Sequence, residues 1–357
     1  MILSLEDYLL AIEEYLPTVL VSSAALSDIR GMARELPPLA SACIECPLGE
    51  VAVETDFSVC VDGALDMLAG RNASAKLDST IVTSPPWQRF RTFCESWSDS
   101  ALLRQTSNVW LEFDRSRHSV PVLRPSVFFG VHRAKDSQRL AEAGVNLLRG
   151  GSLPAHLAHA LSHCFSALPT NARVFQVGVM LSRKNTPVRL CVIGLTRDQL
   201  LDYLLAVGWP GSTKNVQDIL HSVSYHHLLA VTFDLDSGVG GVGPRLGIEC
   251  HMGREYRLVN VYPKWQVFLE QLVRVGLCLP SERDALLRWP GYTVRDVILP
   301  SLFFRGLNHV KVVWEPPGFV YAKAYLIFVH AWRAPTAEVP KRTSKCSPEW
   351  VPPAATV

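Results

Sequence analysis

The sequence lacks the features that would direct it to a membrane, to nucleic acid or to secretion. No run approaches the roughly 18 apolar residues of a membrane span. The opening segment, MILSLEDYLLAIEEYL, is acidic and patterned as a helix, which is not typical of a signal peptide. The formal net charge is only +2 at pH 7, so there is no overall attraction to nucleic acid. These absences predict a cytoplasmic protein with no nucleic-acid partner.

Several metal and enzyme motifs are also missing. The nine cysteines are an odd number scattered over 357 residues, which predicts buried, reduced thiols rather than a disulfide framework. Cys43 and Cys46 form a CxxC, but no second pair or nearby histidine completes a zinc site. No Walker loop, HExxH or GxSxG occurs, and no DDxxD of the all-helical prenyl synthases is present. Any chemistry must therefore come from residues that the fold brings together.

What the sequence does contain is a repeated pattern of helical sequence followed by a pair of strands. Hydrophobic residues make up 48% of the chain, enough for a globular core. Strand pairs with a turn between them recur about every 65 residues. They span residues 41–61, 108–130, 173–195, 228–250 and 308–332. Amphipathic helices are predicted between them, at 85–97, 136–148, 153–168, 196–209, 215–227, 264–276 and 281–289.

This arrangement predicts one α+β domain over residues 1–332. The remainder, 333–357, is proline-rich and aperiodic, so we expect a disordered tail. Ten antiparallel strands could form an open sheet with helices on one face. Alternatively, the sheet could close into a barrel with helices outside, which removes the exposed edges.

The strands have two distinct faces. In residues 51–61, apolar positions alternate with Glu54 and Asp56. The same alternation puts one cation on the polar face of each later hairpin's second strand. In chain order these are Arg124, Arg189, Arg245 and Lys323, with Lys311 on the first strand of the last hairpin. Ordinary exposed charges of an open sheet would produce this pattern. A basic ring with one carboxylate would equally suit a diphosphate, with Mg²⁺ bridging to the aspartate.

Short motifs on these strands resemble the soluble aromatic prenyltransferases with the ABBA, or prenyltransferase-barrel, fold. ETDFSVCV is similar to the strand whose aspartate binds Mg²⁺ in bacterial members, here Asp56. LRPSVFF, VRLCV and PRLGIEC resemble the strands that carry diphosphate ligands, and KAY resembles the K-x-Y pair of the fungal indole branch, here Lys323 and Tyr325. The chain departs from the family pattern at Arg124, in place of a lysine, and at Phe233, in place of a tyrosine.

The resemblance implies five ααββ repeats closed into a ten-stranded antiparallel barrel with helices outside. It also implies transfer of a prenyl group from a prenyl diphosphate to an electron-rich aromatic acceptor in natural product biosynthesis. The acceptor would be an indole or phenol, either free or within a peptide. The implied diphosphate ligands are Arg124, Arg189, Arg245, Lys323, Tyr325 and Lys311. Asp56 would hold Mg²⁺, and Phe128 and Phe233 would shield the carbocation.

The acid–base residue is inferred from alternation alone. Glu249 shares the polar face with Arg245 and is the candidate base for the ring proton. It could equally be an ion-pair partner of Arg245. The alternative function is a barrel that binds a small molecule or peptide without catalysis, and a charge-neutralised interior would favour it.

Overall fold

The computed structural model describes most of the chain up to the end of the last strand. The described residues are 4–51, 53–61, 64–68, 83–114, 124–223, 229–235, 241–252, 262–296 and 300–332. The predicted tail at 333–357 lies outside them, as do the bends of the second and fourth hairpins. Among the described residues, no helix is both long and apolar enough to cross a membrane.

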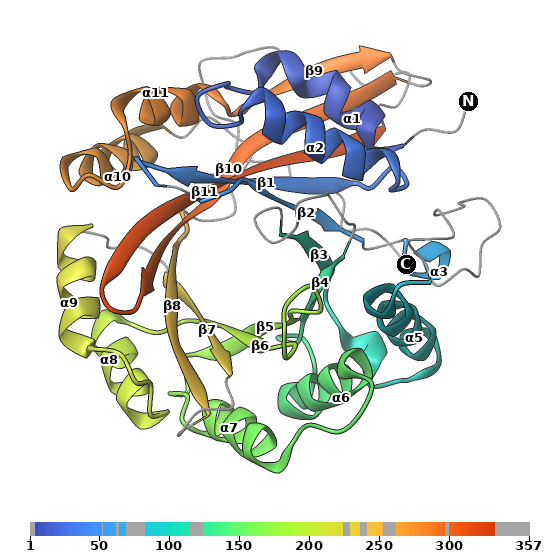
Figure 1. Cartoon of the computed structure of the whole chain (residues 1–357), viewed down its shortest axis with the longest axis vertical. Coiled ribbons are helices and arrows are strands. Elements are labelled where there is room, and N and C mark those ends of the chain that lie inside the picture. Colours follow the sequence, from blue (N-terminus) through green and yellow to red (C-terminus); the bar gives the residue numbers. More distant parts are fainter. Residues whose placement is uncertain are drawn as a thin grey trace.

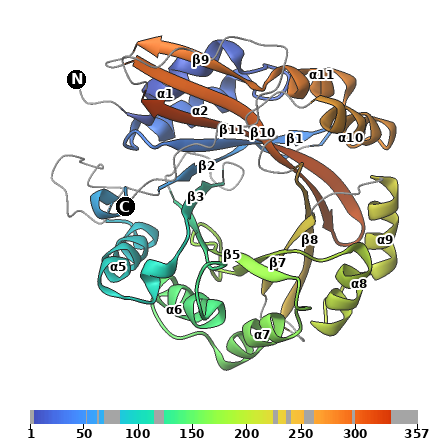
Figure 2. The same cartoon turned by 180° about the vertical axis from the view of Figure 1, so that it is seen from behind.

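The strands form one antiparallel sheet that closes on itself (Figures 1 and 2). In sequence order they are β1 (Ser41–Leu48), β2 (Asp56–Cys60), β3 (Val109–Phe113), β4 (Ser126–Gly130), β5 (Arg173–Val179), β6 (Val188–Ile193), β7 (Leu229–Leu235), β8 (Val242–Cys250), β9 (Gly291–Asp296), β10 (Pro300–Glu315) and β11 (Phe319–Trp332). Strand β11 pairs with both β1 and β10, and this closes a ring of ten strands. The ten-stranded barrel is therefore confirmed, and the open sheet is excluded.

A pair of helices precedes each hairpin, and Figure 1 shows them around the outside of the ring. They are α1 (Leu5–Ile12) and α2 (Ser23–Arg34), α3 (Leu65–Leu68) and α5 (Pro85–Asp99), α6 (Ser137–Arg149) and α7 (Ala155–Ser166), α8 (Arg197–Ala206) and α9 (Thr213–Ser222), and α10 (Tyr262–Arg274) and α11 (Pro280–Arg288). The predicted ααββ repeat is confirmed.

Local sequence explains where these helices begin and end. Asp136 accepts a hydrogen bond from the backbone N–H of Arg139 and so caps α6. The helix ends at Gly150, whose φ of 76° is the left-handed conformation that glycine adopts without steric cost. Thr196 and Gln199 form a capping box at the start of α8.

The core of the protein lies between the outer face of the barrel and the helices. Apolar strand residues such as Phe57, Val59 and Leu190 belong to this large cluster together with side chains of the helices. Cys46 is part of it, whereas Cys43 belongs to a small cluster on the inner face. Cys43 and Cys46 therefore cannot ligate the same metal ion, because residues three apart on a strand point to opposite faces of the sheet.

Two features differ from the sequence-based expectation. The β1–β2 ladder ends at the pair Glu45–Asp56, although β1 continues to Leu48 against β11. The predicted strand at 51–61 is therefore shorter than expected. Glu54 precedes it and is exposed, so it is not an inner-face residue.

The second difference is an eleventh strand, β9, which pairs with the first part of β10 outside the ring. Helix α1 covers this extension, because Tyr8 stacks on His330 of β11 and contacts Phe303 of β10 edge-on. The sequence pattern predicts no strand over Gly291–Asp296.

Candidate functional site in the barrel interior

Most charged side chains on the inner face of the barrel lie toward one end, whereas Glu249 lies at the other end, one residue before the end of β8. The five hairpin bends share the first of these ends, because consecutive strands run antiparallel around the ring. Asp56 is the first residue of β2, Arg189 the second of β6 and Glu315 the last of β10. The interior therefore has a charged region near the bends, an aromatic and apolar region beyond it, and a second charged group around Glu249 at the far end of β8.

Lys323 lies in a buried group with two carboxylates. Its Nζ donates to Asp56 Oδ2 at 2.8 Å and lies 3.9 Å from Glu45 Oε2. Burial opposes the charge on this ammonium, but Asp56 and Glu45 outweigh it and raise the pKa of Lys323. Lys323 and Asp56 are thus inner-face residues, as predicted, and they bind each other.

Arg189 forms a two-pronged ion pair with its direct cross-strand neighbour, Asp234. Nε and Nη2 donate to the two carboxylate oxygens at 2.6 and 3.1 Å. Burial disfavours the ionised carboxylate, but the guanidinium outweighs it and lowers the pKa of Asp234 to about 2. Since Asp234 faces inward, its neighbour Phe233 faces outward and contacts Tyr203 of α8. Placing Phe233 in the pocket was wrong, because strand side chains alternate between faces.

Of these ion-pair groups, the one that contains Arg245 is the most exposed to solvent. Its Nε donates to Glu315 Oε1 at 2.6 Å and its Nη2 to the Tyr321 hydroxyl at 3.1 Å. The side chains of Arg245 and Glu315 are 27% and 37% exposed, against 9% for Lys323. Arg124 differs again, because it is exposed two residues before β4. The structure therefore buries Arg189, Lys311 and Lys323, leaves Arg245 partly open and leaves Arg124 at the surface.

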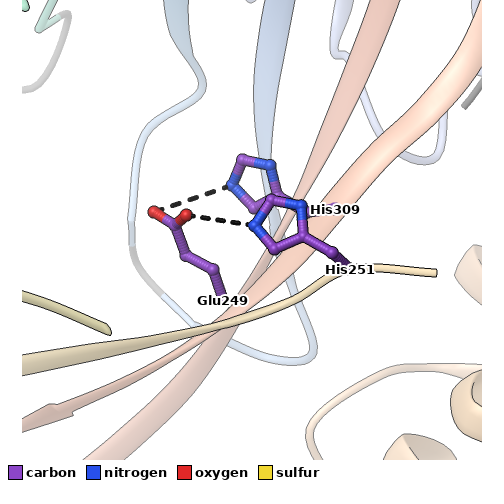
Figure 3. A group of neighbouring side chains, drawn as sticks. All are labelled: Glu249, His251 and His309. Carbon is purple, nitrogen blue, oxygen red and sulfur yellow. Dashed lines mark hydrogen bonds and ion pairs between the residues drawn. The ribbon is translucent and has the colours of Figure 1, made fainter. Parts of the chain in front are cut away.

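Glu249 lies among three basic side chains, Lys311, His251 and His309, and Figure 3 shows the two histidines. Lys311 Nζ is 2.9 Å from Oε1, His251 Nε2 is 3.3 Å from Oε2, and His309 Nε2 is 4.0 Å from Oε1. Burial disfavours the charge, but Lys311, His309 and His251 outweigh it and hold the pKa of Glu249 well below its usual value. Glu249 is thus an ion-pair partner, as one alternative expected, but of Lys311 rather than Arg245.

A fifth ion-pair group lies at the bend of the third hairpin. Arg183 donates to both oxygens of Asp114, at 2.7 and 3.0 Å, and to Glu112 at 3.4 Å. Ser182 donates to Asp114 at 2.7 Å. Burial, followed by the charge of Asp114, raises the pKa of Glu112.

The less polar part of the interior is built from aromatic and apolar side chains. One small cluster contains Phe128, Met180 and Cys191, another contains Tyr325 and Ile327, and Trp110 packs against both. Phe128 is accommodated by Gly178 across the ladder, since a Cβ there would lie 2.4 Å from the ring. Phe128 and Tyr325 are therefore inner-face residues, as predicted.

The interior is close to charge balance. Each of the cations Arg183, Arg189, Arg245, Lys311 and Lys323 lies against a carboxylate. Burial, followed by the charge of Glu112, raises the pKa of Glu45 to about 8, so Glu45 holds its proton at neutral pH. An incoming anion must consequently replace a carboxylate at one of these cations.

The oxygen ligands around Asp56 suit Mg²⁺ by their chemistry, but their arrangement does not. Lys323 Nζ already neutralises the Asp56 carboxylate, and the raised pKa of Glu45 keeps that neighbour protonated, so the pair offers little negative charge to a Mg²⁺ ion. The residues present therefore suit the ammonium group of Lys323 at this position rather than Mg²⁺.

Several interior residues were not singled out from the sequence. Glu45 alternates with Ile44 and Cys46, and Asp234 alternates with Phe233 and Leu235, so the period-two pattern could have placed both inward. The two histidines beside Glu249 carried no such signal. His251 lies beyond the end of β8, and His309 faces Tyr325 at a β-bulge.

Comparisons with known proteins support the fold. No protein-family model and no curated protein matches the sequence. Among solved structures, the chain resembles prenyltransferase PriB in its apo form, with a TM-score of 0.58 and 12% identity over 90% of this chain and 95% of that one. It also resembles AnaPT from Neosartorya fischeri, with a TM-score of 0.45 and 11% identity over 82% and 78% of the two chains. The chain therefore has the prenyltransferase-barrel fold that its strand motifs predicted.

Proposed function

We propose that this protein transfers an allylic prenyl group from a prenyl diphosphate to an electron-rich aromatic acceptor. The observation that carries the proposal is the division of the barrel interior. Arg189, Arg245, Lys311 and Lys323 all project inward, and an aromatic and apolar wall adjoins them. The cations can bind the diphosphate, and the aromatic and apolar wall can bind the hydrocarbon chain of the donor.

Arg245 is the first ligand for the diphosphate in this proposal. Its ion pair with Glu315 is partly exposed, and such pairs contribute little to stability, so exchanging Glu315 for a diphosphate oxygen costs little. The Tyr321 hydroxyl, which Arg245 contacts, can then donate to the same anion. Arg189 and Lys323 lie deeper and add positive charge behind it.

The reaction breaks the allylic C–O bond, and the diphosphate leaves with the electron pair. Trp110, Phe128 and Tyr325 would shield the allylic cation from water. The acceptor ring attacks the cation to form a C–C bond and then loses its proton. Glu249 remains the proposed base, because its low pKa keeps it ionised and a protonated arene is acidic enough for a weak base.

A specific observation favours a second function, non-catalytic binding of a small molecule or peptide. The proposed diphosphate ligands Arg189, Arg245, Lys311 and Lys323 are each paired with a carboxylate, so no preformed excess of positive charge is available to a diphosphate. Donor binding separates the two functions, because only an enzyme of this class must bind a prenyl diphosphate.

The test is calorimetric titration with a non-hydrolysable thiodiphosphate analogue of dimethylallyl or geranyl diphosphate. We expect Arg245→Ala to lower donor affinity at least tenfold, since a charge-assisted hydrogen bond contributes about 1.5–3 kcal/mol. Arg139→Ala is the matched control, because Arg139 is exposed on α6, outside the barrel, and should bind the donor as wild type does.

Turnover is measured with the natural diphosphates and tryptophan or a simple phenol, by diphosphate release and a mass gain of one prenyl unit. If the wild-type chain binds neither donor analogue, the enzymatic function is wrong and the binding function stands. Equal donor affinity in Arg245→Ala and wild type would instead contradict the placement of the diphosphate.

A further inference from the structure

The structure assigns a binding site for a divalent transition-metal ion to Glu249, His251 and His309, a site that does not depend on prenyl transfer. Figure 3 shows both imidazole rings directed at the carboxylate. One ligand atom from each residue lies within 4.8 Å of the other two. Ligand atoms about 2.1 Å from a tetrahedral ion are about 3.4 Å apart. His251 Nε2 lies 3.3 Å from Glu249 Oε2, and His309 Nε2 lies 4.0 Å from the other oxygen, Oε1, so a modest side-chain adjustment brings three ligand atoms to that spacing.

The strand register explains why these side chains meet. Strand β10 pairs Lys311 with Glu249 and Val310 with Cys250 of β8. Continuing that antiparallel register places His309 opposite His251, and their ring centroids are 4.9 Å apart. His309 also stacks on Tyr325 at 3.9 Å, which holds its ring plane. Two of the three ligands therefore lie on paired barrel strands, which keeps the site rigid.

Asn308 can form the hydrogen bond that a metal-binding histidine makes with its second ring nitrogen. Its side-chain amide lies 3.1 Å from His309 Nδ1. Among the described residues, no donor reaches the buried Asn308 Oδ1. Rotating the amide by half a turn lets Oδ1 accept a hydrogen bond from Nδ1–H. That tautomer leaves Nε2 deprotonated and able to bind a metal.

Lys311 competes with the ion for Glu249. Its Nζ is 2.9 Å from Oε1, so metal binding must displace this ammonium, and its flexible stem allows the movement. Removing Lys311 should therefore strengthen metal binding, whereas removing a ligand should weaken it. A network that only stabilises the fold would not respond in these opposite directions.

The ligand chemistry selects the type of ion. Two imidazoles and one carboxylate suit Zn²⁺, Co²⁺ or Fe²⁺ rather than Mg²⁺ or Ca²⁺, which prefer oxygen ligands. Three protein ligands also leave a fourth position open, as in catalytic rather than structural zinc sites. A bound ion would add positive charge and a Lewis acid to the charge-balanced interior.

The test is titration of the chelator-stripped full-length chain with Co²⁺, whose visible absorption reports nitrogen-containing tetrahedral coordination. We expect one Co²⁺ per chain, displaced by Zn²⁺. His251→Ala and His309→Ala should each lower the affinity at least 100-fold, and Asn308→Ala about 10- to 100-fold. Lys311→Met should raise it, and Zn²⁺ should raise the unfolding midpoint of that variant.

The controls are His159→Ala and His163→Ala, on the exposed face of α7, where two stacked histidines could also attract a metal ion. These variants should bind Co²⁺ as the wild type does. Circular dichroism confirms folding, and the Asn308 variant tests the site without removing a ligand. Absence of Co²⁺ uptake by the wild type, or uptake undiminished in both interior histidine variants, overturns the assignment.

Discussion

Buried carboxylates in this barrel differ in protonation because they face different numbers of cations. Glu249 faces Lys311 and two histidines, and its pKa is held well below the usual range. Glu45 is equally buried, but Glu112 and Asp56 add negative charge around it, and its pKa rises to about 8. A carboxylic acid and a carboxylate thus share one interior at neutral pH, which is how proteins separate acid and base roles.

Glu45 makes stability depend on pH in a defined direction. Its folded-state pKa of about 8 lies above the ordinary glutamate value of 4.5, so the folded state retains a proton that the unfolded chain releases between these values. Its stabilising contribution is therefore complete below pH 4.5 and is lost as the pH rises through 8. Glutamine has no titratable proton in this range. We therefore expect the unfolding free energy of Glu45→Gln to fall less than that of the wild type between pH 5 and 9. Urea unfolding across this range measures it.

The control for this prediction is Glu50→Gln, because Glu50 is exposed. That variant should follow the wild-type pH profile. Parallel profiles for Glu45→Gln and wild type would show that Glu45 is ionised in the folded protein.

At the level of elements, the first hairpin is attached to the last helix by one carboxylate. Glu282, in the first turn of α11, accepts hydrogen bonds from the backbone N–H of Leu279 and of Gly49, both at 2.8 Å. The first bond caps the helix, and the second joins the bend after β1 to the fifth repeat. Gly49 has a φ of 76°, which favours glycine at this turn.

Glu282→Ala should lower the unfolding free energy by about 1–3 kcal/mol, because it leaves two backbone N–H groups without an acceptor. Glu282→Gln keeps an acceptor oxygen and should recover part of the loss. The control is Glu35→Ala at an exposed position, with an expected change within about 0.5 kcal/mol. Chemical denaturation measures all three, and equal stability of Glu282→Ala and wild type would contradict the capping role.

For the whole molecule, closure of the barrel depends on the last strand. β11 is hydrogen-bonded to β1 on one side and to β10 on the other, so it joins the two ends of the chain. Without it, both neighbours become edge strands with unpaired backbone groups, which promote aggregation.

We therefore expect a chain that ends at Trp332 to melt as the full-length protein does, because the segment beyond it was predicted to lie outside the folded domain. A chain that ends at Gly318 lacks β11 and should lose cooperative unfolding and aggregate. Thermal melts by circular dichroism, with size-exclusion chromatography, compare the two. A lower midpoint for the longer truncated chain would show that residues 333–357 contribute to the domain.

The sequence by itself determined the faces of the strands. Alternation placed Arg189, Arg245, Lys311 and Lys323 inward, because side-chain direction depends only on local backbone geometry. Phe233 was predicted to lie in the pocket although it alternates with the inward Asp234, and that prediction was wrong. The repeat likewise predicted the helical layer and ten of the eleven strands in the described part of the chain.

Only the tertiary structure decided which charges meet. Lys323 and Asp56 are 267 positions apart, and their contact exists because β11 closes the barrel against β1. Glu249 pairs with Lys311 rather than Arg245 because the β8–β10 register sets those two residues opposite each other. Register and barrel closure depend on residues far apart in the chain. The sequence therefore predicts which strand face is charged, but only the fold decides which of these charged residues pair with each other.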